Sequence, residues 1–315
     1  MSLSLCAKSV ANTGVIQCDV APGIPAFFMV WNGSAKIEDI QGSQFQAFLE
    51  ANSKLSKNDI NKIFVFPIIQ DITDATEANK EGTLNQGFKT ILLEGKPAYT
   101  YKVFAGQSTV PQLRKFNNQS VRTLTMDTNM RAWGVRSTDN YVGAQAKIFT
   151  GGLKFATGQN VEEGVATISI SYLAASELND DAAFGEVDSA AGIVGLLDAN
   201  IFYISNVGNV FEIGVSVPTA EIGESISLYD TYSVELEAAA LWSAKTGANF
   251  TVDLPIITVA KNDALSAWTI TFDPTAYGLL GTNAKIELSL APPPDLDAAD
   301  IDGIEGVPVI LTKTA

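Results

Sequence analysis

The sequence predicts a mainly β fold in two domains: an N-terminal β-sandwich or barrel with one short helix, then a C-terminal β-sandwich of immunoglobulin-like type. Three observations lead to this fold class. Short apolar runs alternate with turn residues, only one segment has a clear helical periodicity, and the charge balance changes sharply near mid-chain. At 315 residues, the chain is long enough for two domains.

The charge of the chain is divided unevenly. Residues 1–157 contain sixteen Lys and Arg against twelve Asp and Glu, whereas residues 158–315 contain four Lys against 23 Asp and Glu. The net charges are therefore +4 and −19, which together give the −15 of the whole chain. A shift of this size predicts a domain boundary near Gly158, between a β-rich domain (1–157) and an acidic β-sandwich domain (158–315).

In the first domain, apolar runs bounded by turn residues predict strands. The best helix candidate is 43–54, where Ser43 offers an N-terminal cap and Phe45, Phe48 and Leu49 fall on one face. A second, short helix is predicted at 110–116. The turn at 127–130 predicts a β-hairpin, and Pro67 predicts an edge strand or a bulge. The expected strands are 26–31, 63–69, 87–93 and 99–104 (around a turn at 94–97), 121–126 and 131–135.

The second domain shows a more regular β pattern. Residues 165–172 alternate strictly between apolar and small polar residues, as a half-buried strand should. Repeated short strands with turn residues between them favour a β-sandwich. No Cys–Trp–Cys framework is present. The further expected strands are 211–217, 232–238, 250–259, 268–272 and 284–290, with turns at 206–209, 245–247, 273–274 and 281–283.

The residue content excludes many chemistries. The chain has no His, so it cannot form Ser-His-Asp or Cys-His arrangements or His-ligated metal sites. Two Cys are too few for a structural zinc site or an iron–sulfur cluster. We therefore assign no catalytic, cofactor-binding or metal-binding residue and expect no enzyme. The four Trp residues are expected to anchor the cores.

Acidic clusters at 177–181 and 295–303 are rich in oxygen ligands, but neither matches the EF-hand loop. We expect both to be solvated loops, with Asp295 capping a short helical turn after the proline run 292–294. Cys6 and Cys18 flank a fold-back at 12–14; they either pair or remain two buried thiols, and the second interpretation is favoured.

The sequence also limits location and partners. It has no recognisable signal peptide and no run of about 18 apolar residues, so we expect synthesis in the cytoplasm and no membrane span. The acidic half lacks the clustered Lys and Arg that phosphate neutralisation needs, so we expect no specific nucleic-acid binding.

Three segments resemble virion structural proteins of tailed phages, particularly those that infect Bacteroidetes. They are the cysteine-containing opening through 12–19, the 127–134 hairpin followed by Gly143 and 149–152, and the tail 297–309. The resemblance implies a tail-tube-like or capsid-type subunit. Tail tube subunits are β-sandwiches or barrels that join edge to edge into stacked rings, often with an added immunoglobulin-like domain. Their lumens are acidic, whereas the acidity here lies mostly in the half that would be the added domain.

The leading hypothesis is a self-assembling virion protein, most readily a phage tail tube subunit, made in the host cytoplasm. Its partners would be copies of itself and other virion proteins, with the first domain making the assembly contacts. A major capsid protein with two β-barrels, or a capsid decoration protein, is the alternative. A carbohydrate- or receptor-binding module is the alternative from another class, and it requires exposed aromatic residues in a concave site.

Overall fold

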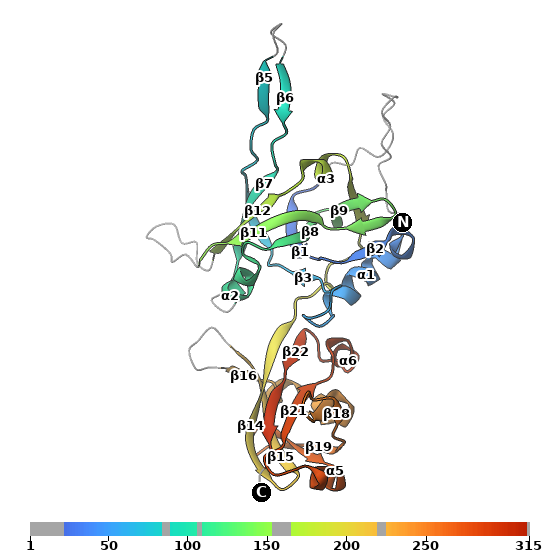
Figure 1. Ribbon diagram of the computed structural model, residues 1–315, viewed down its shortest axis with the longest axis vertical. Coiled ribbons are helices and arrows are strands. Elements are labelled where there is room, and N and C mark those ends of the chain that lie inside the picture. The colour runs from blue at the N-terminus through green and yellow to red at the C-terminus, as the bar shows by residue number, and fades with distance from the viewer. Residues whose placement is uncertain (1–21, 84–88, 106–108, 153–164, 219–224, 314–315) are drawn as a thin grey trace. The chain divides into compact units, whose positions relative to one another are not determined.

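The computed structural model describes residues 22–83, 89–105, 109–152, 165–218 and 225–313. It is mainly β, with 47% strand and 19% helix, which confirms the predicted fold class. The chain forms two compact units: Met1–Ser53 with Lys57–Gly195, and Lys54–Ser56 with Leu196–Ala315. They are called unit 1 and unit 2 below. Figure 1 shows the strands and short helices of each unit.

Unit 1 is built on an eleven-stranded sheet that curls into a half-barrel. Its helices are α1 (Gln44–Ser53), α2 (Thr109–Leu113) and α3 (Ala175–Asn179), with 3-10 turns at Ile37–Ile40 and Arg114–Phe116. Its strands are β1 (Pro25–Val30), β2 (Ser34–Lys36), β3 (Phe64–Val65), β4 (Ile69–Asp74), β5 (Lys80–Thr83), β6 (Lys89–Leu93), β7 (Ala98–Phe104), β8 (Ser120–Asp127), β9 (Arg131–Ser137), β10 (Asn140–Val142), β11 (Ala144–Thr150), β12 (Val165–Tyr172) and β13 (Ala182–Glu186).

The order of the curled sheet is β2-β10-β9-β8-β11-β12-β7-β4, with β1 joined to β8, β3 to β1, and β13 to β9. The predicted hairpin at 127–130 is confirmed, because β8 and β9 pair antiparallel with Thr125 opposite Trp133. The predicted strand 63–69 is divided at Pro67 into β3 and β4, since proline cannot donate a backbone hydrogen bond to the ladder.

The two predicted helices of unit 1 are present as α1 and as α2 with its following 3-10 turn. Helix α1 buries Phe45 and Leu49. A Cβ atom on Gly185 of β13 would lie 2.4 Å from the Phe45 ring, so only glycine lets the helix approach the sheet this closely. Packing of the amphipathic face therefore fixes α1 on the sheet.

The pairing of β12 shows that the boundary between the units differs from the one that the charge pattern predicted. It pairs with β11 and with β7, so residues beyond 158 complete the sheet of unit 1. The division into units falls at Gly195 and Leu196, and not near Gly158. Residues 158–195 hold seven acidic and no basic residues, so the net charge is −3 for residues 1–195 and −12 for residues 196–315.

Unit 2 is a sandwich of two sheets, in the orders β19-β20-β15-β14-β22 (with β16 on β15) and β18-β17-β21-β23. Its helices are α4 (Tyr229–Tyr232), α5 (Pro274–Leu279) and α6 (Pro293–Asp297), with 3-10 turns at Glu235–Glu237 and Ala239–Leu241. Its strands are β14 (Leu197–Val207), β15 (Val210–Pro218), β16 (Ser225–Ser227), β17 (Trp242–Thr246), β18 (Val252–Asp253), β19 (Ile256–Asn262), β20 (Ala267–Phe272), β21 (Lys285–Leu290), β22 (Ile304–Val307) and β23 (Val309–Thr312).

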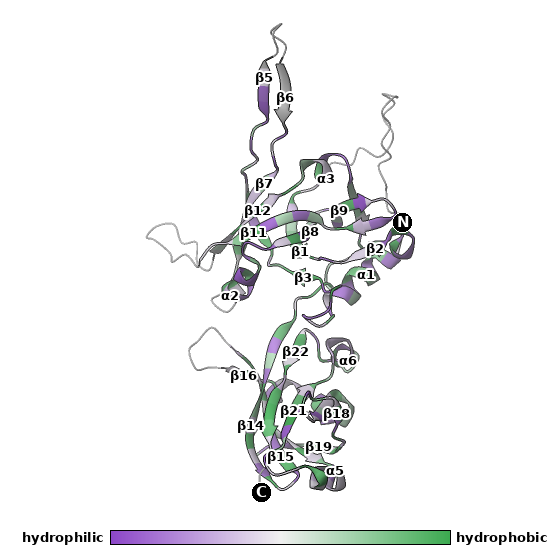
Figure 2. Ribbon diagram, in the orientation of Figure 1, coloured by the Kyte–Doolittle hydropathy of each residue, from purple (hydrophilic) through white to green (hydrophobic). Residues whose placement is uncertain are grey.

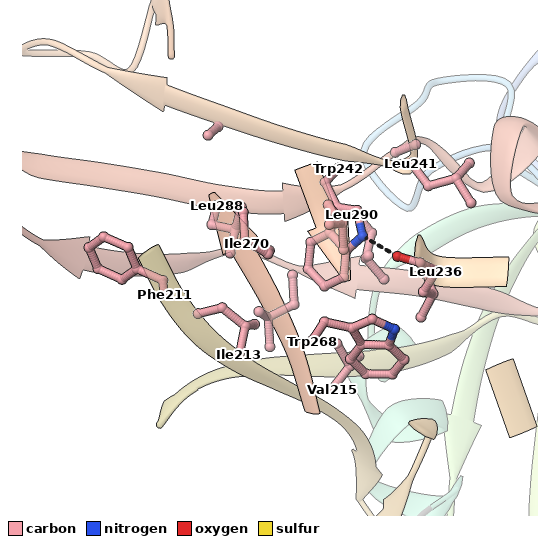
Figure 3. Close-up of a cluster of buried hydrophobic side chains, with 14 of the residues drawn as sticks. Phe211, Ile213, Val215, Leu236, Leu241, Trp242, Trp268, Ile270, Leu288 and Leu290 are labelled. Carbon is pink, nitrogen blue, oxygen red and sulfur yellow. Dashed lines mark hydrogen bonds between the residues drawn. The ribbon is translucent and has the colours of Figure 1, made fainter. Parts of the chain in front are cut away.

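One hydrophobic core holds the two sheets of unit 2 together (Figure 3). Phe211 and Ile270 come from the larger sheet, whereas Leu288 comes from the smaller one. The indole rings of Trp242 and Trp268 lie 6.2 Å apart, and the Trp242 Nε1 donates a hydrogen bond to the Leu236 carbonyl at 2.8 Å. The shared core confirms the predicted C-terminal sandwich.

Some predicted elements of unit 2 are wrong. Residues 232–238 form the end of α4 and a 3-10 turn, in place of the expected strand. The range 250–259 contains β18 and most of β19, separated by Leu254 and Pro255. The sequence pattern did not indicate β14, β16, β17, β22 or β23, although β14 is the longest strand among the described residues.

Candidate assembly surface

A two-stranded ribbon, here called the arm, extends from the curled sheet and is formed by residues 69–83 and 89–104 (Figure 1). Strands β4 and β7 pair at its base, and β5 and β6 pair near its tip. Between these pairs, the Ala75 N–H donates to the Ala98 carbonyl at 2.8 Å and the Glu77 N–H to the Lys96 carbonyl at 3.3 Å. The ribbon is therefore hydrogen-bonded along its length.

The arm corrects one sequence-based expectation. The segment 94–97 does not turn β6 back onto β7, because β6 pairs with β5 and β7 pairs with β4 and β12. It is a link between two pieces of one side of the ribbon. At this link a Cβ atom on Gly95 would lie 1.8 Å from the Glu77 carbonyl oxygen, so glycine is required by the close approach of the two backbones.

The outer part of the arm is exposed to solvent, whereas Tyr101 and Val103 at its base are buried in the core. Every residue from 73 to 81 is exposed, and so are Glu94 and Lys96 on the return side. The β5 segment is hydrophilic (Figure 2). Strands β5 and β6 pair only with each other among the described residues, so both outer edges of the ribbon near its tip present unpaired backbone groups.

Among the described residues, the curled sheet itself also has open edges. Strand β2 lies at one end of the strand order and β4 at the other. The outward residues Thr100 and Ser169 of β7 and β12 are joined by a hydroxyl–hydroxyl hydrogen bond of 3.1 Å, which is typical of a polar outer face. The opposite, inward face carries Tyr101 and Ile168, which are buried in the core.

A buried carboxylate organises the β8–β9 hairpin. Asp127 is 1% exposed, and its two oxygens accept four N–H hydrogen bonds. Oδ1 accepts from the backbone N–H groups of Asn129 and Arg131 at 2.9 and 3.0 Å. Oδ2 accepts from the Gly23 N–H and from the Trp133 Nε1, both at 2.9 Å. All four lone-pair directions are used, so this carboxylate holds structure and has no capacity left for a ligand.

Two of the cavities formed by the described residues lie on unit 1. The first, of about 300 Å³, is lined by residues that include Glu50, Glu186 and Asp188. The second, of about 270 Å³, is lined in part by Arg122 and Glu177, whose side chains are 3.6 Å apart. In the first cavity two carboxylates have partners, because Gln46 donates to Glu50 at 2.8 Å and Arg131 donates to Glu186 at 3.3 Å.

The two acidic clusters singled out in the sequence lie in different units. Glu177 of the first cluster is in α3 and accepts a 2.7 Å hydrogen bond from the Gln145 N–H. Asp295 of the second cluster lies inside α6. It does not cap this helix, because Pro292 occupies the N-cap position. Among the described residues, no three His, Cys, Asp or Glu side chains gather into a group that could hold a metal ion.

Two carboxyl groups of the second cluster interact directly within unit 2. A hydrogen bond from Asp302, together with the ammonium of Lys54 at 2.7 Å, lowers the pKa of Asp297. The same hydrogen bond and the charge of Asp297 raise the pKa of Asp302. The pair therefore shares a proton more readily than two isolated aspartates would.

The tryptophans behave largely as predicted. Trp31, Trp242 and Trp268 are buried core residues, and Trp133 is half-buried against Phe184, with ring centroids 4.7 Å apart. Cys6 and Cys18 lie outside the described residues.

Aromatic residues are exposed in both units: Phe149 on β11 of unit 1 is 54% exposed, and β14 of unit 2 presents two more that the sequence did not single out. Phe202 is 45% exposed and Tyr203 is 47% exposed on β14. A Cβ atom on Gly214 would lie 2.2 Å from the Phe202 ring, so the ring covers this glycine on the neighbouring strand. Covering a strand glycine with an aromatic ring stabilises the sheet, which accounts for the position of Phe202.

In the described parts of the chain, no helix has the length and apolar character needed to cross a membrane. Comparison of the chain with protein-family models, with curated proteins and with solved structures finds no match.

Proposed function

We propose that this chain is a structural subunit that assembles with copies of itself, as a virion protein and most readily as a subunit of a phage tail tube. The observation that carries the proposal is the arm. A two-stranded ribbon that stands alone is marginally stable in water, because it has no second layer on which to bury its side chains. The ribbon here is exposed from 73 to 81 and is nevertheless hydrogen-bonded along its length.

The free energy for ordering such a segment comes most directly from contact with another molecule. Its unpaired edges offer rows of backbone N–H and C=O groups, which are the usual sites for adding a strand from another chain. The open ends of the curled sheet at β2 and β4 offer the same chemistry. A contact between two different edges of identical subunits produces a ring when the rotation closes and a helical stack when it does not.

The direct test is microscopy of the purified full-length protein, combined with sedimentation velocity over a hundredfold range of concentration. We expect rings or tubes that build up with concentration. Closed shells or trimers would instead favour the capsid alternative. A chain that remains monomeric at the highest concentration, and also after addition of preformed seeds from a virion preparation, would contradict the proposal.

The carbohydrate- or receptor-binding alternative has less support. The exposed rings of Phe202 and Tyr203 are aromatic groups of the kind that stack on sugars, but neither lines either cavity described above. A glycan array probed with the wild-type chain and with Phe202→Ala tests it. Binding that the substitution abolishes would favour this alternative.

A further inference from the structure

Exposed cations lie beside an exposed aromatic residue on the outer face of unit 1. Along β11, Lys147 and Phe149 are exposed, whereas Ala146, Ile148 and Thr150 beside them in the sequence are buried. The alternation places both exposed side chains on the outward face of the curled sheet. Phe149 is 54% exposed, so its ring offers apolar surface for a contact.

The chain brings two more cations to the same end of β11. The 3-10 turn Arg114–Phe116 ends at Asn117, whose backbone pairs with Ile148. The side-chain amide of Asn117 accepts a hydrogen bond from the Thr150 N–H at 2.7 Å and donates one to the Thr150 carbonyl at 3.2 Å. These contacts hold the exposed Arg114 and Lys115 beside the end of β11. The name basic patch is used below for Arg114, Lys115, Lys147 and Phe149.

The cations of the basic patch differ from other arginines of unit 1, which have carboxylate partners. Arg122 lies 3.6 Å from Glu177, and Arg131 donates to Glu186 at 3.3 Å. In the described part of the chain, by contrast, the three cations of the basic patch form no ion pair. Their positive charge is therefore available to a partner molecule.

Unit 2 has a patch of the opposite sign at the end of β19. Glu237 accepts a 3.1 Å hydrogen bond from the Lys261 N–H, and Asp263 accepts one from the Tyr229 hydroxyl. These bonds join the 3-10 turn Glu235–Glu237 and α4 to the end of β19, so their carboxylates gather there against the single ammonium of Lys261. The name acidic patch is used below for Asp230, Glu235, Glu237 and Asp263, together with Val234 and Leu265.

The acidic patch combines charge and apolar surface as the basic patch does. Val234 is 61% exposed and Leu265 is 47% exposed, so apolar side chains lie among the carboxylates as Phe149 lies among the cations. Specific interfaces commonly have an apolar or aromatic centre and a polar rim. The two patches therefore complement each other in charge and in hydrophobicity.

A second copy of this chain suits the basic patch better than another polyanion does. Residues 196–315 have a net charge of −12, so two such units repel each other and are attracted to an oppositely charged surface. The affinity for a nucleic acid rises with the number of phosphates that cations neutralise, and the patch offers only three cations in a chain of net charge −15.

We infer that the basic patch on unit 1 of one copy binds the acidic patch on unit 2 of a neighbouring copy. Every copy carries both halves of the contact, so the contact is head-to-tail and continues from copy to copy. This inference rests on the proposed self-assembly and specifies a surface that is separate from the open strand edges.

Charge reversal on each side tests the contact. One variant reverses the basic patch (Lys115→Glu with Lys147→Glu), a second reverses the acidic patch (Asp230→Lys with Glu235→Lys), and a third combines the four substitutions. All four positions are exposed, so circular dichroism should show the wild-type fold for each variant. Association constants are measured by sedimentation velocity at low ionic strength, where charge contacts are least screened.

We expect each single-patch variant to lose roughly tenfold in association constant, because like charges then face each other at the contact. The fourfold variant should recover, and so should an equimolar mixture of the two single-patch variants, in which each copy meets the opposite charge on its neighbour. The control, Lys36→Glu with Lys245→Glu, makes the same charge change as the basic-patch variant at exposed positions outside both patches, and it should associate as the wild type does.

The apolar centre of the contact is tested by Phe149→Ala. We expect association to weaken by about tenfold or more, because aromatic residues at the centre of an interface are the usual hot spots. The matched control is Phe202→Ala, which removes a similarly exposed ring outside both patches and should leave the association constant unchanged.

Three results would overturn the inference while leaving the proposed self-assembly intact. One is association of both single-patch variants at the wild-type level. Another is recovery of the fourfold variant without recovery of the mixture, which would mean that the charges act within one chain. The third is binding of a single-stranded oligonucleotide, measured by fluorescence anisotropy, that the basic-patch variant loses while its self-association is normal. A wild-type chain that stays monomeric would overturn the proposed function itself.

Discussion

Replacement of Asp127 by Asn is the sharpest test of what holds unit 1 together. The substitution keeps the shape of the side chain but changes one acceptor oxygen into an NH₂ group, which only donates. The two oxygens of Asp127 each accept two hydrogen bonds, so the amide can satisfy only two of the four donors. In either orientation, two N–H groups face another donor at a site that is 1% exposed.

The cost follows from those two lost contacts. A hydrogen bond to a charged group is worth about 1.5–3 kcal/mol, so losing two costs about 3–6 kcal/mol. A typical domain is stable by only about 5–15 kcal/mol, so this is a large part of the total. For a unit of this size, each kcal/mol shifts the melting temperature by roughly 2–4 °C, and we expect a drop of about 6–24 °C.

The assay is thermal unfolding followed by far-UV circular dichroism, together with urea unfolding at neutral pH. The matched control is Asp139→Asn, an exposed aspartate in the turn between β9 and β10 of the same unit, and its effect should stay within about 0.5 kcal/mol. If Asp127→Asn melts within 2 °C of the wild type and keeps its urea midpoint, the four-donor account of this site is wrong.

Three further predictions follow from the arm and from unit 2. Gly95→Val should loosen the arm without lowering the melting temperature of unit 1, because its side chain would meet the Glu77 carbonyl oxygen. Hydrogen exchange at 73–83 and 89–97 should become faster, whereas Gly152→Val, at a position with no atom within 4 Å of the added Cβ, should leave it unchanged. Burial and the Asp263 hydrogen bond raise the pKa of Tyr229 to about 12, above its ordinary value of 10.0. The neutral hydroxyl therefore adds stability below pH 10, and this stability is lost as the pH rises toward 12. Tyr229→Phe should remove that part of the alkaline loss of stability, measured by urea unfolding at a series of pH values, and an unchanged pH profile would contradict this prediction. Lys313 Nζ donates to the Tyr277 and Leu280 carbonyls at 3.0 and 2.7 Å, at the end of α5. Lys313→Met should cost about 1.5–3 kcal/mol in unfolding free energy, and the exposed Lys285→Met should cost much less; equal effects would refute the capping role.

Where the hydrophobic periodicity depends only on residues close in the sequence, it predicted the secondary structure well. Residues 165–172 alternate strictly because β12 lies between β11 and β7 with one face on the core, and the strand has the predicted bounds. The helix at 44–53 was also predictable, because its apolar residues recur at helical spacing. In both cases, a single buried face imposes the period.

Other patterns were ambiguous. The run 232–238 contains Val234, which is 61% exposed, and Leu236, which is fully buried, and a short alternation of this kind suits a helical turn as well as a strand. Strand β14 was missed although Asp198 and Asn200 alternate with the buried Ala199 and Ile201, as they should in a half-buried strand. The charge shift marked a change in surface composition, whereas the division between the units depends on which strands pair.

The sequence by itself determined the mainly β class, most strand positions and the absence of histidine chemistry, because composition and local periodicity contain that information. Only the tertiary structure decided that 69–83 and 89–104 form one two-stranded arm, and that Asp127 accepts a hydrogen bond from the Gly23 N–H across 104 residues. Strand pairing joins backbone groups that every residue carries, so the residue types along one strand do not specify its partner. That choice is made by the packing of the whole sheet.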